Sequence, residues 1–177
     1  MAVALGSAEA TVAQQTERPQ VTSPILTIDS DRLFEDSSYG QLTIEEFEAR
    51  GAALAAENRR IEAELEAEEQ ELTELRPTIA PVDFRLLADD FDARVQEIRR
   101  AQDSKSRALN TELEERRVVF LNSAVPILEQ LMRETGAAVV IEKRTVFISS
   151  NAVDITPIAI DRLNMVLTGP DVPDPQQ

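Results

Sequence analysis

A heptad pattern that begins near Thr43 limits the possible folds of this chain more than any other feature. Seven of ten positions spaced alternately by three and four residues are apolar, as in a helix that packs along one seam against another helix. These seam positions are Ile44, Phe47, Gly51, Leu54, Asn58, Ile61, Leu65, Glu68, Leu72 and Leu75. Thr43 and Glu46 match a capping box, so we expect the helix to begin there.

Two prolines separate this helix from a second one. Pro77 and Pro81 interrupt the pattern, because proline lacks a backbone donor and disfavours a helical residue before it. The second helix is expected from Val82 or Asp83 to Gly136. Its seam residues are Phe84, Leu87, Phe91, Val95, Ile98, Leu109, Leu113, Val119, Phe120, Ile127, Leu128 and Leu131. A helix, a short turn and a helix form an antiparallel hairpin, whose first helix would reach roughly 50 Å at about 1.5 Å per residue.

The two predicted helices carry complementary charges. The first has a dense run of glutamates near its end, and the second carries several arginines and Lys105, so opposite charges favour their pairing. Asn58 is a polar residue at a seam position. It can fix the register of the pair, or it can be a poorly packed site that the helix tolerates, and the sequence leaves both readings open.

Short apolar segments flank the hairpin on both sides. The run 25–29 indicates a buried strand, followed by a helical turn that Ser30 or Asp31 caps. After the hairpin, the β-branched runs 137–142 and 145–149 predict two strands joined as a β-hairpin by Lys-Arg. Thr156 then predicts the cap of a short final helix, with a proline in its first turn.

These segments predict a mainly helical α+β fold, in which a long antiparallel coiled-coil arm is inserted into a small β body. The expected parts are a disordered N-terminus or signal-peptide remnant (1–24), the body (25–42 and 118–168), the arm (43–117) and a disordered tail (169–177). Three strands bury too little surface to be stable alone, so we expect the body to oligomerise. The residues expected at that interface, unless they pack within one protomer, are Ile28, Val139, Val140, Ile141, Phe147 and Ile148.

The composition excludes several classes of function. A formal charge of −15 argues against binding to nucleic acid or to anionic lipid. The chain has no Cys and no His, which removes thiol chemistry, histidine bases and the usual zinc sites. Its five glycines are scattered, so no phosphate-binding loop is present. Asp29 and Asp31 are better explained by a strand end and a helix cap than by a metal site. We therefore expect a protein that is not an enzyme and binds no cofactor.

The order of elements resembles that of the Skp/OmpH family of periplasmic chaperones. The opening strand 25–29 with Leu33 and Phe34 is similar to the first strand and turn of that family. The stretch 139–156 resembles its closing strands and final helix start. The resemblance spans about residues 25–167. It implies a homotrimer whose strands join in a central β body, with three helical arms around a cavity, and ATP-independent capture of unfolded outer-membrane proteins in the periplasm.

The charge of this chain departs from that family, whose well-known members are basic. A trimer would carry about −45, which is three times −15, and this argues against binding to lipopolysaccharide.

Contact with client is a hypothesis for four apolar residues of the second helix, although packing between the two arm helices is the favoured explanation for them. These residues are Phe84, Leu86, Leu87 and Phe91. An alternative function is that of an envelope scaffold or adaptor that binds a folded partner through the same coiled coil.

Overall fold

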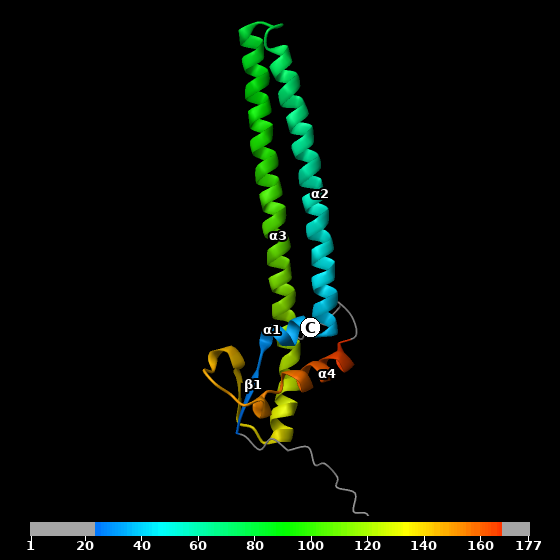
Figure 1. The fold of residues 1–177 in the computed structure, drawn as a ribbon, viewed down its shortest axis with the longest axis vertical. Coiled ribbons are helices and arrows are strands. Elements are labelled where there is room, and N and C mark those ends of the chain that lie inside the picture. The colour runs from blue at the N-terminus through cyan, green and yellow to red at the C-terminus, as the bar shows by residue number, and fades with distance from the viewer. Residues whose placement is uncertain (1–23, 168–177) are drawn as a thin grey trace, which may run out of the picture.

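Two long helices form a narrow arm that stands on a small mixed body (Figure 1). The computed structural model describes residues 24–167. In order, the elements are β1 (Ile25–Ile28), α1 (Ser30–Glu35), α2 (Ser38–Leu75), α3 (Pro81–Thr135), β2 (Val139–Glu142), the 3-10 turns η1 (Lys143–Thr145) and η2 (Asn151–Val153), and α4 (Thr156–Val166). The expectations for residues 1–23 and 169–177 lie outside the described residues.

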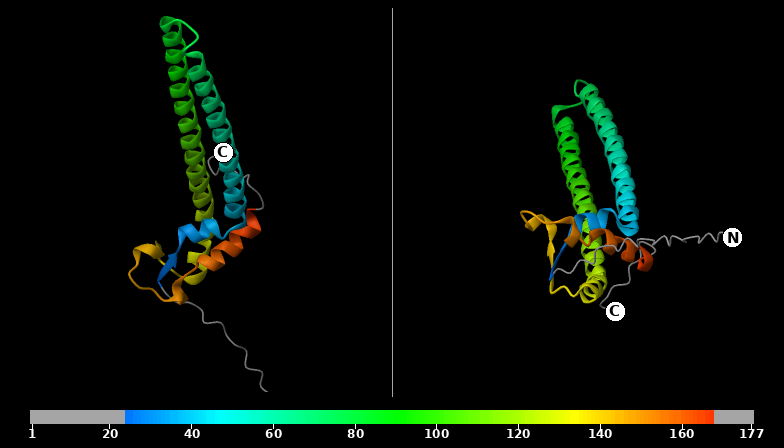
Figure 2. Two further views of the ribbon diagram at one scale, coloured as in Figure 1. Left: turned by 45° about the horizontal axis from the view of Figure 1, so that its top comes forward. Right: turned by 60° about the horizontal axis from the view of Figure 1, so that its bottom comes forward.

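The seam predicted for the first helix is confirmed in α2. From Ile44 to Leu72, every predicted seam position is buried or half-buried, whereas Leu75 at the helix end is 37% exposed. The two views of Figure 2 show α2 and α3 side by side along the length of the arm. The arm is thus a two-helix coiled coil with an apolar seam.

The seam predicted for the second helix is wrong at two positions, Leu87 and Val119, whose side chains are exposed. Ala88 is half-buried on the seam, and Leu87 is 44% exposed. At about 100° of rotation per residue, Ala88 lies about 40° around the helix from Phe84, and Leu87 lies about 60° away on the other side. Because Phe84, Phe91 and Val95 are half-buried on the seam, Ala88 lies on the same face and Leu87 lies outside it.

The helix starts differ from the predicted ones. The first arm helix begins at Ser38 and not at Thr43, because the Ser37 hydroxyl accepts a hydrogen bond from the Gly40 N–H at 3.0 Å. Thr43 lies inside the helix and donates to the Tyr39 carbonyl at 2.8 Å. Asp29, rather than Ser30 or Asp31, caps α1.

Later helix boundaries agree more closely with the sequence. Pro81 occupies the first turn of α3, and the helix ends at Gly136, whose φ of 69° lies in the left-handed region. At the start of α4 the cap position is Ile155, so the prediction that Thr156 caps this helix is wrong. The prediction of a proline in its first turn is confirmed.

The sheet is parallel, and the predicted β-hairpin is wrong. β1 pairs with β2 from Ile25↔Val139 to Ile28↔Glu142, so the whole arm is the crossover between two parallel strands. Residues 143–145 form a 3-10 turn, and residues 146–150 belong to no strand. Lys-Arg lacks a residue that tolerates the positive φ of a two-residue hairpin, and β2 finds its partner in β1 instead.

An aromatic cluster forms the core at the base of the arm. The Tyr39 and Phe120 rings stack with centroids 5.3 Å apart, and Phe34 meets Phe120 edge to face at the same distance. Leu26 and Leu163 are fully buried beside them, from β1 and α4. Because these residues come from α1, α2, α3 and α4, the core fixes the root of both arm helices. None of the helices within residues 24–167 is long and apolar enough to cross a membrane.

Candidate client-binding arm and assembly surface

One flank of the arm is joined by ion pairs between α2 and α3. Its three links are Arg50–Glu112 at 2.6 Å, Glu57–Lys105 at 2.7 Å and Glu68–Arg94. All six side chains are more than a third exposed, so solvent screens the charges and each link contributes little to stability. Together they hold the two helices in one register, as the opposite charges of the helices predict.

The same contacts shift the titration of the glutamates. Hydrogen bonds from Lys105 and then Gln102 hold the pKa of Glu57 below its ordinary value. The Arg94 guanidinium lowers the pKa of Glu68 in the same way. These glutamates therefore stay ionised, and their bridges stay formed, at any pH near neutrality.

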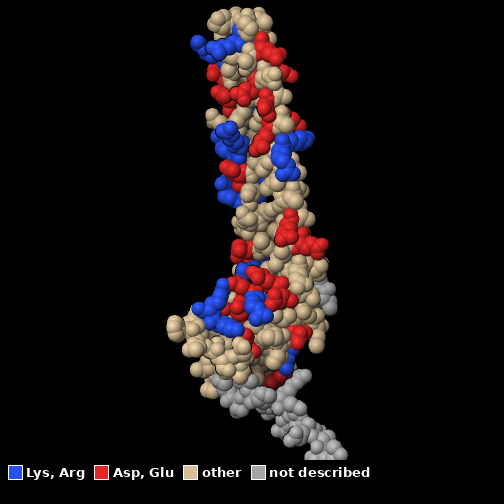
Figure 3. Space-filling view, in the orientation of Figure 1, with Lys and Arg blue, Asp and Glu red and all other residues tan. Residues whose placement is uncertain are grey.

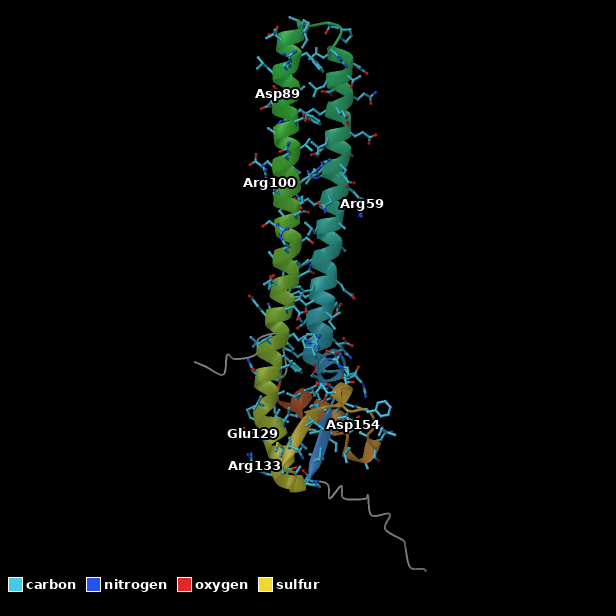
Figure 4. The ribbon with its side chains drawn as sticks, turned by 90° about the vertical axis from the view of Figure 1, so that its left-hand side faces the viewer. Arg59, Asp89, Arg100, Glu129, Arg133 and Asp154 are labelled. Atoms are coloured by element: carbon cyan, nitrogen blue, oxygen red, sulfur yellow. The ribbon has the colours of Figure 1, made fainter. Side chains whose placement is uncertain are left out.

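The opposite flank of the arm opens into a groove of about 700 Å³. Its apolar lining residues are Ile61, Leu65, Phe91, Val95 and Ile98. Acidic side chains of α2 and α3 line it as well, and the space-filling view shows that acidic groups are prominent along the upper arm (Figure 3). Figure 4 places Arg59 on α2 and Asp89 and Arg100 on α3, along the length of this arm.

The structure divides the four predicted client-binding residues into two pairs. Leu86 is 65% exposed and Leu87 44% exposed, whereas Phe84 and Phe91 are half-buried on the seam. Arg76 lies over the Phe84 ring, with the guanidinium carbon 5.5 Å from the ring centroid. The two phenylalanines therefore serve arm pairing first, and the two leucines are open to other molecules.

The apolar tip also includes a residue that sequence reasoning missed. Val82 is 68% exposed and lies four residues before Leu86, so the two share the outer face of α3. The sequence feature that could have identified Val82 is an apolar residue directly after Pro81, at the end of a predicted arm that has no other element to cover it. We call Val82, Leu86 and Leu87 the tip patch.

The six predicted assembly residues differ widely in exposure within one protomer, and Val139 is 39% exposed. Ile28 is buried in the protomer core, and Val140 and Ile141 are half-buried. By contrast, the Phe147 side chain is fully exposed, and Ile148 is 83% exposed.

The sheet has an open edge at β2, the strand that precedes these two residues in the chain. β1 has β2 on one side and the Thr27↔Asp154 bridge on the other, but the described residues give β2 no second partner. An open strand edge and exposed apolar side chains are both features through which another chain can bind.

Charged residues hold the turn after β2 to the rest of the body. Asp31 pairs with Arg117 of α3 and with Arg144 of the turn, and Lys143 pairs with Asp154 at 2.6 Å. The described residues hold no group of three side chains suited to a metal ion. Asp29 and Asp31, the pair considered in the sequence, act as a helix cap and as a partner for two arginines.

Comparison with known proteins agrees with this architecture. The family model of outer membrane proteins (OmpH-like) matches residues 24–163. A crystal structure described as a candidate outer membrane chaperone (OmpH-like) from Caulobacter crescentus CB15 is similar, with a TM-score of 0.73 and 16% sequence identity. The match covers 87% of this chain and 93% of that one. No curated protein matches. The chain belongs to the OmpH-like outer membrane protein family.

Proposed function

We propose that this protein is an ATP-independent holdase of the periplasm, which captures unfolded outer-membrane proteins between its arms and keeps them from aggregating. The tip patch is the observation that carries the proposal. Val82 and Leu86 are each about two thirds exposed on an arm only two helices wide, far from the core that could have buried them. Uncovered apolar side chains on a charged arm suit weak, repeated contact with unfolded chains.

We further propose that three copies assemble through their bodies. The open edge of β2 and the exposed Phe147 and Ile148 support this arrangement, because pairing there would bury apolar surface that one protomer leaves in water. Three arms around one cavity would offer several tip patches to the same client. Weak contacts linked in this way sum to useful affinity without a nucleotide cycle.

The proposed function is tested by diluting urea-unfolded outer-membrane β-barrels into buffer and following light scattering. We expect the wild-type chain to suppress aggregation of several unrelated barrels, and the double variant Val82→Gln/Leu86→Gln to be at least about threefold less effective. The matched control is Met165→Gln/Val166→Gln, which removes two equally exposed apolar side chains from α4. A wild-type chain that fails to suppress aggregation contradicts the holdase function and favours an adaptor for a folded partner.

Assembly is tested separately by light scattering of the client-free protein. We expect a mass of three times 19.6 kDa for the wild type. Phe147→Ser/Ile148→Ser should shift the mass toward one chain, and Met165→Ser should not. A wild-type monomer contradicts the trimer.

A further inference from the structure

The groove between the arm helices has an apolar floor and an acidic rim. Its floor comes from seam residues that the partner helix covers only in part, and its rim from the side chains next to them. The acidic rim residues are Glu62, Glu66, Glu69, Asp92 and Asp103. About 700 Å³ lies within the usual range of ligand pockets, and here it takes the form of a trough between two helices.

The negative charge on this rim is not compensated. Within residues 24–167, Arg99 is the single basic residue that lines the groove, and none of the five rim carboxylates has an ion-pair partner. On the other flank, Glu57 and Glu68 each meet a cation of α3. The same two helices therefore have one neutralised flank and one flank that attracts cations.

Two hydrogen-bond acceptors at the end of the groove also lack partners. Asn58 Oδ1 and Gln102 Oε1 are buried without a donor in the described part of the chain, and both residues line the groove. The Gln102 amide already donates to Glu57 at 3.2 Å, so its oxygen remains to be satisfied. A buried acceptor without a donor is unfavourable, and both oxygens lie beneath the surface that a bound segment could touch.

We propose that this groove binds basic segments of the client, in which arginine or lysine alternates with large apolar side chains. The inference rests on the proposed function and names the kind of segment that the arm selects. Leucine or phenylalanine side chains would lie on the floor against residues such as Leu65 and Val95, while guanidinium groups meet the rim carboxylates. A second copy of this chain is a poor occupant, because each copy carries −15.

The inference is tested by fluorescence anisotropy on the full chain with a labelled peptide of alternating arginine and leucine. The comparison peptide has glutamate in place of every arginine. We expect the basic peptide to bind at least about tenfold more tightly than the acidic one. This binding should weaken as salt rises, because exposed charges are screened.

Two triple variants with the same change in charge locate the binding site. Glu62→Gln/Glu66→Gln/Glu69→Gln removes the rim charge of α2, and we expect it to weaken binding of the basic peptide roughly fivefold. The control changes three glutamates of α2 that do not line the groove: Glu64→Gln, Glu71→Gln and Glu74→Gln. It should leave the affinity within about twofold of the wild type. Circular dichroism checks that both variants remain helical.

The outcomes separate this inference from the proposed function. If both peptides bind equally, or both triple variants weaken binding equally, the groove is not a site for basic segments. If either result is found while the chain still suppresses barrel aggregation, the inference about the groove is overturned and the proposed holdase function stands. Tight, groove-dependent binding of the basic peptide without suppression of aggregation supports the inference and contradicts the holdase.

Discussion

Lys143 and Asp154 form an ion pair at the base of the arm, with Nζ 2.6 Å from Oδ2. The other carboxylate oxygen of Asp154 accepts from the N–H and the hydroxyl of Thr156, at 3.0 and 2.6 Å. The Thr156 hydroxyl oxygen in turn accepts from the Asp29 N–H at 2.9 Å. One carboxylate thus joins the turn after β2, the end of β1 and the start of α4.

Replacing this carboxylate should loosen the body. We expect Asp154→Ala to lower the free energy of unfolding by about 2 kcal/mol, because the Lys143 ammonium and the Thr156 donors lose a largely buried partner. Asp161→Ala is the control. Asp161 is an exposed residue of α4, and it makes no ion pair within residues 24–167. Urea denaturation measures both variants. Equal stability of the two would remove Asp154 from this role.

The same carboxylate should make stability depend on pH. Burial alone would raise the pKa of Asp154, but hydrogen bonds from Lys143 and Thr156 outweigh it and hold the pKa below its ordinary value. The stabilisation is therefore complete above the unfolded pKa of about 3.9 and is lost as pH falls through the lower folded pKa. Melting temperatures measured between neutral and acid pH should drop more steeply below that value for the wild type than for Asp154→Ala. Parallel curves would contradict the assignment.

Two glycines of α2 should respond oppositely to alanine. A Cβ at Gly40 would overlap the Phe34 carbonyl oxygen, so Gly40→Ala must separate α1 from α2 and should lower the free energy of unfolding by about 3 kcal/mol. Apart from the neighbouring residues of its own helix, no atom lies within 4 Å of a Cβ at Gly51, and Gly51→Ala should raise stability by about 1 kcal/mol through helix propensity. Thermal denaturation distinguishes the two. A harmless Gly40→Ala would show that the two helices are not held this closely.

Asn58 should make the helical arm less stable than an apolar residue at the same seam position would. Its amide oxygen is buried without a donor, so Asn58→Leu should raise the free energy of unfolding by about 1 kcal/mol or more. Asn110→Leu is the control, because Asn110 is exposed on α3 and gains no comparable contact. Circular dichroism during urea denaturation follows the helical arm. If both substitutions have the same effect, the gain comes from leucine itself and not from the unpaired amide.

Phe91 and Leu86 should separate arm stability from client capture. Phe91→Ala removes a seam side chain and should destabilise the arm by about 2 kcal/mol. Leu86 is 65% exposed, so Leu86→Ala should change stability by no more than about 0.5 kcal/mol while weakening suppression of barrel aggregation. Urea denaturation measures the stability of each variant, and light scattering measures its suppression of barrel aggregation. If Leu86→Ala suppresses aggregation as well as the wild type does, Leu86 does not contribute to client binding.

The helical arm was predictable because its information is local. Heptad spacing and two prolines determine where the arm helices pair and where they turn, and the φ-positive Gly136 marks where α3 ends. The resemblance of the segments on both sides of the arm led to the family that the comparison then showed. Even so, the choice between Leu87 and Ala88 depended on the geometry of the whole seam.

The sequence by itself thus determined the helices, their seam and the acidic charge, because periodicity and composition act along neighbouring residues. Tertiary structure decided the rest. Whether β2 pairs with the next segment or with β1, more than a hundred residues earlier, depends on which partner the folded core brings within reach. The acidic rim of the groove likewise combines carboxylates of α2 and α3, and only the packing of the two helices brings them to the same flank.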